Sequence, residues 1–116
     1  MKKQKVLEKD IQNGICEYLD ILMKQNKLMF WRQNTVPVFD RSRNSFRRQP
    51  KYSLNGVSDI IVVVYGKVIF IEVKRPGGKQ SPAQKEFEKL CFENNATYFV
   101  ATSLEEVISN LKLFVI

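Results

Sequence analysis

Apolar and polar residues recur along the chain with two different periods, which divide it into helices and strands. From Val6 to Lys24 apolar residues return every three or four positions, and this spacing predicts an amphipathic helix. The buried stripe of that helix is expected to contain Ile11, Ile15, Leu19 and Leu22. The next segment, "LMFWRQN", predicts a short strand that includes Phe30 and Trp31.

The strongest pattern is "DIIVVVYGKVIFIEVK", residues 59–74, in which two β-branched runs flank Gly66. This arrangement predicts a β-hairpin. The following "SPAQ" predicts the start of a helix, with Ser81 as the N-cap, Pro82 at the first position and Gln84 completing a capping box. The apolar face of this helix is expected to consist of Phe87, Leu90 and Cys91.

The remaining pattern completes one α/β domain that spans residues 1–116. "ATYFVA" predicts a strand, and "SLEE" predicts a second capping box and a last helix. The buried residues of that helix should be Leu104, Val107, Ile108 and Leu111, and the tail "KLFVI" is either a closing strand or exposed apolar surface. A right-handed crossover from Val68 to Ala101 makes one strand pair parallel, so we expect a mixed sheet with a central hairpin flanked by helices.

The segment between the first strand and the hairpin, residues 35–56, is long, polar and interrupted by Pro37 and Pro50. We expect a loop or a poorly ordered excursion, and loops of this length are usually functional or mobile. Phe46 and Tyr52 are interleaved with its cations, which suits phosphate contacts and stacking on an unpaired base. A solvated basic loop is the alternative. The cations are Arg41, Arg43, Arg47, Arg48 and Lys51.

Charge and composition narrow the function further. Nineteen Lys and Arg against twelve Asp and Glu leave a net charge of +7, which favours an anionic partner such as nucleic acid. Because the chain has no histidine, Ser-His and Cys-His nucleophiles and histidine-metal sites are excluded. Cys16 and Cys91 are interpreted as small core residues. With no signal peptide and no apolar run of roughly 20 residues, we expect a cytoplasmic protein outside the membrane.

The hairpin brings charged residues together at one end. Directly opposed residues of paired strands share a face. Two-residue turns in two registers place Asp59 opposite Lys74 or opposite Glu72, and both registers gather these three side chains. A three-residue turn would instead pair Asp59 with Val73 and separate them. A two-residue turn therefore predicts two neighbouring carboxylates, Asp59 and Glu72, beside Lys74.

Two carboxylates at such a distance repel each other and need a compensating cation. Lys74 supplies one charge, and a divalent metal supplies more and prefers oxygen ligands. The backbone carbonyl of Val73 is a candidate further ligand. The alternative is that Glu72 and Lys74 lie on a solvated face or form a salt bridge at its rim.

Two polar residues on helix faces are further candidates. Glu8 precedes the buried stripe of the first helix at helical spacing, so it is a candidate ligand; the alternative is a glutamate stabilised by the helix dipole. Gln84 lies in line with Phe87 and Cys91, and a role in the site is compatible with its role in the capping box.

The ordered series of Asp59 followed by Glu72-Val73-Lys74 resembles the PD-(D/E)xK nuclease superfamily. Within it, the helix bearing Glu8 and the segments "RQN", "GVSD", "EVKRPGGKQSPAQ" and "YFVATS" resemble a stand-alone VRR-NUC (virus-type replication-repair nuclease) domain. One departure is Ser58, where the family usually has proline.

The resemblance implies a restriction-endonuclease-like fold with an α-β-β-β-α-β core and Mg²⁺- or Mn²⁺-dependent cleavage of DNA. Glu8, Asp59, Glu72 and the Val73 carbonyl would hold the metal. Lys74 would position or deprotonate the attacking water, and Gln84 would orient Lys74 or that water.

Substrate and partner follow from the same resemblance. Stand-alone members look like structure-selective enzymes, and resolution of four-way DNA junctions by a C2 homodimer is the expected role. The tail "KLFVI" or the face of an end helix would form the dimer interface. Three further cations near the site, Arg32, Arg75 and Lys79, would extend the DNA track. The alternatives are a branched-DNA-binding module that does not cut, and an RNA-cleaving enzyme of similar fold.

Overall fold

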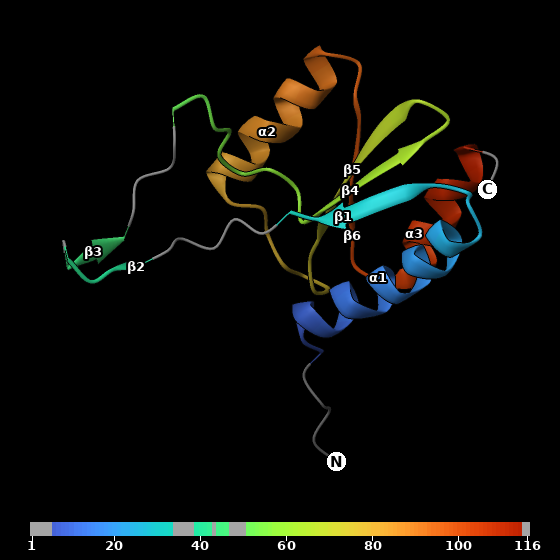
Figure 1. Cartoon of the computed structure of the whole chain (residues 1–116), viewed down its shortest axis with the longest axis horizontal. Coiled ribbons are helices and arrows are strands. Elements are labelled where there is room, and N and C mark those ends of the chain that lie inside the picture. The colour runs from blue at the N-terminus through green and yellow to red at the C-terminus, as the bar shows by residue number, and fades with distance from the viewer. Residues whose placement is uncertain (1–5, 34–38, 43, 47–50, 115–116) are drawn as a thin grey trace.

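The computed structural model describes residues 6–33, 39–42, 44–46 and 51–114, and its main body is an α/β fold around one sheet (Figure 1). The helices are α1 (Glu8–Lys24), α2 (Pro82–Glu93) and α3 (Leu104–Leu111), followed by a 3₁₀ turn η1 (Lys112–Phe114). The strands are β1 (Met29–Arg32), β2 (Phe39–Asp40), β3 (Ser45–Phe46), β4 (Ile60–Val64), β5 (Lys67–Val73) and β6 (Thr97–Ala101).

The main sheet has four strands in the order β1-β4-β5-β6. The β1–β4 and β4–β5 pairs are antiparallel and the β5–β6 pair is parallel, so the predicted mixed sheet with a hairpin and a crossover is confirmed. Val64 lies opposite Lys67, which makes Tyr65 and Gly66 the two turn residues. Both have positive φ, 49° and 77°, as a tight hairpin turn requires. This register extends to Asp59 opposite Glu72.

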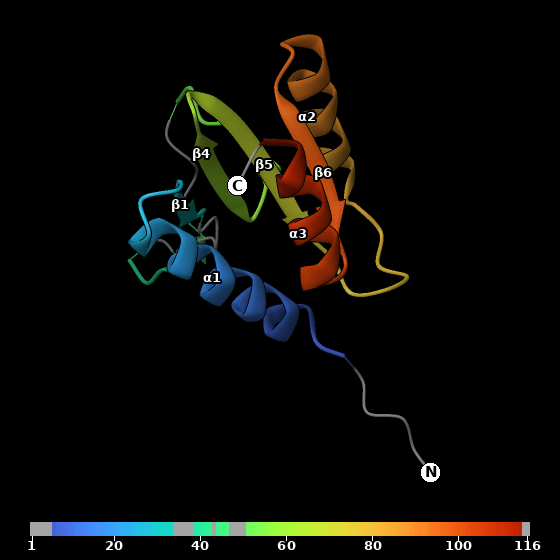
Figure 2. The same cartoon turned by 90° about the vertical axis from the view of Figure 1, so that its right-hand side faces the viewer.

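Helices cover the two faces of the sheet unequally (Figure 2). α1 and α3 pack on one face, where residues of even number in β4 and odd number in β5 meet the helix residues Ile15, Leu19, Val107 and Leu111 in one buried core. α2 lies on the other face, where the ring of Phe87 meets the ring of Phe70 edge-on at 5.0 Å. The predicted stripe of the first helix is confirmed, with Ile11 only partly buried against the core.

Several local expectations need correction. The first helix begins at Glu8 rather than Val6, and Leu90 of α2 is 41% exposed because a single described helix covers this face and buries only a narrow stripe. Within the segment expected to be a loop, β2 and β3 form a separate two-stranded sheet. Leu104 and Ile108 are only partly buried. The tail is a 3₁₀ turn rather than a strand, with Leu113 79% exposed and residues 115–116 outside the described part.

Both predicted helix starts are present, but their N-termini are capped by different hydrogen bonds. Ser81 and Gln84 form the full reciprocal capping box at α2. At α3, Ser103 accepts a hydrogen bond from the Glu106 N–H, whereas the Glu106 carboxylate binds the N–H and hydroxyl of Thr102. The cysteines are free, Cys91 buried and Cys16 partly buried, as expected for core residues. Among the described residues, no helix has the length and apolar character needed to cross a membrane.

Candidate metal centre

Three carboxylates from three parts of the fold meet at one end of the sheet. Glu8 is the first residue of α1, Asp59 directly precedes β4, and Glu72 lies near the end of β5. Each contributes an oxygen atom, and these atoms lie within 4.8 Å of one another. The predicted convergence of Asp59 and Glu72 is therefore confirmed, and Glu8 joins them from the helix. Such a set of oxygen donors is of the kind that divalent Mg²⁺ or Mn²⁺ prefers.

Glu72 is the central group of this cluster. Its side chain is fully buried, and its Oε2 atom is buried without a hydrogen-bond partner among the described residues. Burial, the hydrogen bonding and negative charge of Asp59, and the nearby Glu8 carboxylate together raise the pKa of Glu72 to about 9, while the Lys74 ammonium group acts to lower it. A buried carboxylate oxygen without a donor is costly in the absence of a cation. The site therefore fits a metal ion bound at Oε2.

Asp59 ties the end of β4 to its neighbouring strands. Its Oδ2 atom accepts a hydrogen bond from the N–H of Val73 at 2.8 Å, and its backbone carbonyl accepts one from the N–H of Gln33 at 2.8 Å. These bonds fix the carboxylate beside Glu72. The Val73 carbonyl lies at the same end of the sheet, and its role as a ligand stays a prediction.

Lys74 follows β5 directly, and its N–H donates to the carbonyl of Ala101 at 3.0 Å. Its Nζ atom lies 3.8 Å from Oε1 of Glu72, and its side chain is 12% exposed. Glu72 is fully buried and Lys74 is nearly buried. The alternative that Glu72 lies on a solvated face is therefore wrong. The pair places one ammonium group at the edge of the acidic cluster.

Gln84 connects the start of α2 to the carboxylates. Its Oε1 atom accepts from the Ser81 N–H at 2.8 Å, while its Nε2 atom donates to Oε1 of Glu72 at 3.0 Å. The capping box thus uses the Oε1 atom of the Gln84 amide, and the contact with the carboxylates uses its Nε2 atom. The side chain contacts Glu72. The role that the resemblance implied for Gln84, orienting Lys74 or a water, stays a prediction. Gln84 therefore acts as a positioning residue for the buried carboxylate.

Two neighbours of the cluster were not recognised as site residues in the sequence. Gly56 has φ of +70°, and a Cβ atom built there would lie 2.2 Å from the carbonyl oxygen of Ala83. The backbone of the "GVSD" segment therefore packs directly on the first turn of α2, one residue from Gln84. Gln33 pairs with Asp59 through its backbone. No local pattern marked Gly56, because only the docking of α2 makes its missing Cβ essential.

We expect Gly56→Ala to lower the free energy of unfolding by about 2–5 kcal/mol, because it combines a left-handed backbone with a clash against Ala83. Urea denaturation measures the change. Gly66→Ala is the matched control: Gly66 also has positive φ, but nothing lies within 4 Å of its Cβ position. Equal losses in the two variants would contradict the close packing of Gly56 on α2.

Ser58, at the position where the resembled family usually has proline, is fully buried. Its hydroxyl donates to the carbonyl of Ile60 at 3.1 Å. The serine is therefore satisfied by hydrogen bonding, and its substitution for proline leaves the adjacent Asp59 in place.

The predicted DNA-contacting cations are spread over the molecule. Arg32 precedes Gln33, whose N–H binds the Asp59 carbonyl, and Arg75 directly follows Lys74. Both are exposed, as is Lys79 in the segment between β5 and α2. Arg41 and Lys51 are also exposed, but β2 and β3 beside Arg41 lie apart from the main sheet (Figure 1). Predicted contacts that fall outside the described residues are Arg43, Arg47 and Arg48.

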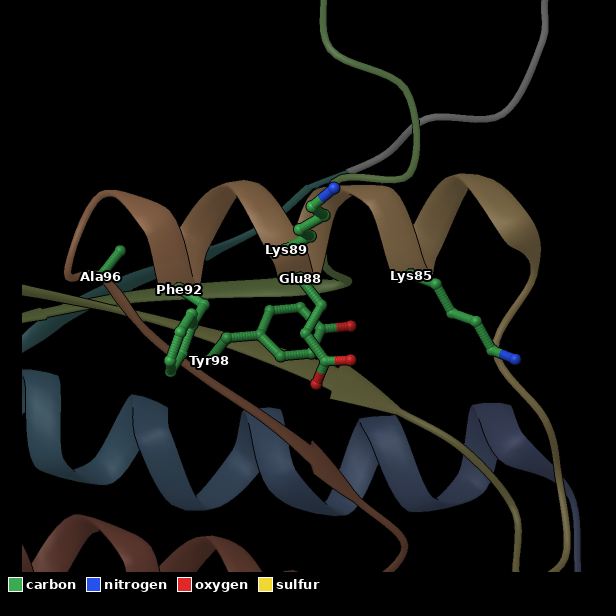
Figure 3. Close-up of a pocket in the computed structure, with 6 residues that line it drawn as sticks. All are labelled: Lys85, Glu88, Lys89, Phe92, Ala96 and Tyr98. Carbon is green, nitrogen blue, oxygen red and sulfur yellow. The ribbon is translucent and has the colours of Figure 1, made fainter.

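Two cavities in the described part of the chain are lined by residues other than the three carboxylates. One of about 300 Å³ is lined by Val6, Arg75, Pro76 and Gly77. Another of about 360 Å³ lies along α2 and the edge strand β6, where Phe92 and Tyr98 lie close together and Lys85 points away (Figure 3).

Comparisons with protein-family models, with curated proteins and with solved structures found no match to this chain. The likeness to VRR-NUC domains consequently depends on the quoted motifs alone. The function has to be argued from the geometry of the carboxylates, Lys74 and Gln84.

Proposed function

We propose that this chain is a metal-dependent, structure-selective DNA endonuclease with a restriction-endonuclease-like fold, of the VRR-NUC type in the PD-(D/E)xK superfamily. The observation that carries the proposal is the convergence of Glu8, Asp59 and Glu72 within 4.8 Å, around a buried carboxylate oxygen that has no hydrogen-bond partner in the part of the chain that the structure describes. Lys74, 3.8 Å from Glu72, supplies the adjacent cation. The order α1-β1-β4-β5-α2-β6 agrees with the implied core.

The residues divide into ligands and positioning groups. Glu8, Asp59 and Glu72 would hold Mg²⁺ or Mn²⁺, with the Val73 carbonyl as a further candidate. A bound ion would lower the pKa of water and neutralise charge on a phosphate. Lys74 directs an ammonium group to the same place, where it can orient a water or stabilise a phosphoryl oxygen as negative charge develops. Gln84 holds Glu72 in position.

The substrate class follows from charge and from the elements at the site. A net charge of +7 and the exposed Arg32, Arg75 and Lys79 suit a polyanion. Nothing in the chain resembles a base-reading helix, so recognition of DNA shape is proposed, with branched DNA and four-way junctions as the preferred substrates. Symmetric cutting of two strands requires two related active sites, and a C2 homodimer would supply them.

Metal removal tests the proposal directly. The purified chain is incubated with a four-way junction, a flap, a single strand and a blunt duplex in Mg²⁺, in Mn²⁺ and in EDTA. We expect cleavage of branched substrates in either metal and none in EDTA. The Asp59→Asn variant should cleave at least about 10²-fold more slowly than the wild type. Asp20→Asn is the matched control, because Asp20 is a carboxylate on α1 whose side chain is 42% exposed and paired with Lys24.

Each alternative gives a distinct result. Tight binding of branched DNA without cutting in either metal would favour a non-catalytic module. Faster cutting of matched RNA would favour an RNA-cleaving enzyme. Normal cutting by Asp59→Asn would contradict the assignment of the metal centre.

A further inference from the structure

One half of the sheet face that bears the metal centre is open in the described structure. α2 covers the β5–β6 half, where Phe87 contacts Phe70 and Tyr98. On the β1 side of the same face, Met29 is 52% exposed and Trp31 is 41% exposed. Trp31 shares this face because it lies opposite Ile61, whose neighbour across the hairpin is Phe70. A large aromatic group is therefore presented beside the site.

Trp31 is close to the ligands and held in a defined orientation. Asp59 is two residues from Ile61, the partner of Trp31, and such diagonal neighbours are separated by roughly 7–8 Å. The indole Nε1–H donates to Oε1 of Gln33 at 3.2 Å, and the N–H of Gln33 donates to the Asp59 carbonyl. The ring is thus linked through one residue to a metal ligand.

Single exposed aromatic residues are common on protein surfaces and need no function by themselves. Three features together distinguish Trp31: its ring is oriented by a hydrogen bond, it lies one row of side chains from the carboxylates, and the chain carries a net charge of +7. Aromatic rings in a basic setting are platforms on which unpaired bases stack. A separation of roughly 7 Å also corresponds to about two base steps along one DNA strand.

We propose that Trp31 stacks on an unpaired base next to the scissile phosphate, with Gln33 positioning the indole. This inference rests on the proposed nuclease function and deepens it. A base inside a continuous duplex is stacked on both sides, so its face is closed to Trp31. The site accordingly selects DNA with an unpaired nucleotide within about two steps of the cut, as in a flap, a single strand or the centre of a junction.

Intrinsic fluorescence gives a direct test, because Trp31 is the single tryptophan of the chain. The 116-residue chain is titrated with a short oligothymidylate and with a blunt hairpin duplex in Ca²⁺. Anisotropy of a dye on the DNA reports occupancy independently. At equal occupancy we expect quenching of Trp31 by the oligothymidylate and little change with the duplex.

Variants measure the contribution of the ring to affinity. Trp31→Ala should weaken binding of oligothymidylate by about 5- to 100-fold, the range expected for loss of one base–aromatic stack, while duplex binding changes little. Trp31→Phe keeps an aromatic face and should retain most of the affinity. Phe92→Ala is the matched control, because Phe92 is 83% exposed on α2 beside the cavity in Figure 3 and should leave binding unchanged.

The outcomes separate this inference from the function on which it rests. Binding of oligothymidylate without any fluorescence change, or with unaltered affinity in Trp31→Ala, overturns the stacking role and leaves the nuclease proposal intact. An equal loss in Phe92→Ala assigns the base to the α2 cavity and overturns it. Dissociation of a dimer by Trp31→Ala in sedimentation also overturns it, in favour of a contact between copies. Absence of binding to any DNA overturns the nuclease proposal as well.

Discussion

Glu72→Gln is expected to stabilise the metal-free protein at pH 8 and to abolish both its stabilisation by Mg²⁺ and its cleavage of DNA. Glu72 is fully buried, and its pKa is raised to about 9 from an ordinary 4.5. The neutral carboxyl therefore contributes stability that is complete below about pH 4.5 and is lost as the pH rises toward 9. Glutamine keeps the shape and the contact with Gln84 without the charge.

The expected size follows from the same shift. Each pKa unit corresponds to about 1.4 kcal/mol, so the variant should exceed the metal-free wild type by about 2 kcal/mol or more at pH 8. The difference should vanish near pH 4.5. Thermal unfolding at a series of pH values, with EDTA or with Mg²⁺, measures it. Mg²⁺ should stabilise only the wild type.

A variant that is less stable than the wild type in EDTA at pH 8 would contradict the uncompensated burial of Glu72. A variant that still responds to Mg²⁺ would show that Glu72 is not needed to hold the metal. Glu86→Gln is the matched control: this exposed glutamate of α2 has the same chemistry and should change neither the pH profile nor the response to metal.

Lys74→Met is expected to lower the rate of DNA cleavage by about 10²–10⁴-fold while leaving Mg²⁺ binding in place. Lys74 lies 3.8 Å from Glu72 and is almost buried, so its ammonium group is held at the site by the fold. Methionine fills a similar volume without the charge. Because Lys74 lowers the pKa of Glu72, the variant should also require a higher pH for metal binding.

Single-turnover cleavage of a branched substrate measures the chemical step, and the Mg²⁺-dependent shift in melting temperature measures metal binding separately. Lys67→Met is the matched control, since Lys67 is an exposed lysine at the opposite end of β5 that lies over the ring of Phe114. Unchanged cleavage in Lys74→Met would assign this lysine a structural role. Lys74→Arg tests the compact ammonium against a planar guanidinium.

Much of the fold follows from local patterns in the sequence. The β-branched runs on either side of Gly66 determine a hairpin, and the capping box of Ser81 and Gln84 determines where α2 begins. The strands β2 and β3 within the polar segment 35–56 were not predicted, because a two-residue strand is too short to show a periodic pattern. Leu90 was expected in the core because helical spacing indicates a face, but the width of the buried stripe depends on what covers it.

The candidate site divides in the same way. Strand periodicity combined with a two-residue turn places Asp59, Glu72 and Lys74 at one end of the hairpin, because paired residues must share a face. The positions of Glu8 and Gln84 depend on how α1 and α2 dock against the end of the sheet. Their contacts with Glu72 are long-range and carry no local pattern, since each is equally consistent with an ordinary helix-end residue.

The sequence by itself thus determined the order of the helices and of the strands in the main sheet, the register-dependent meeting of Asp59 and Glu72, and the charge that favours an anionic partner. Tertiary structure decided that the Glu72 Oε2 atom is buried without a donor among the residues that the structure describes, that Gly56 allows α2 to approach, and that Trp31 is presented beside Asp59. The physical reason is that periodicity specifies which face a side chain occupies, whereas the docking of distant elements specifies what that face meets.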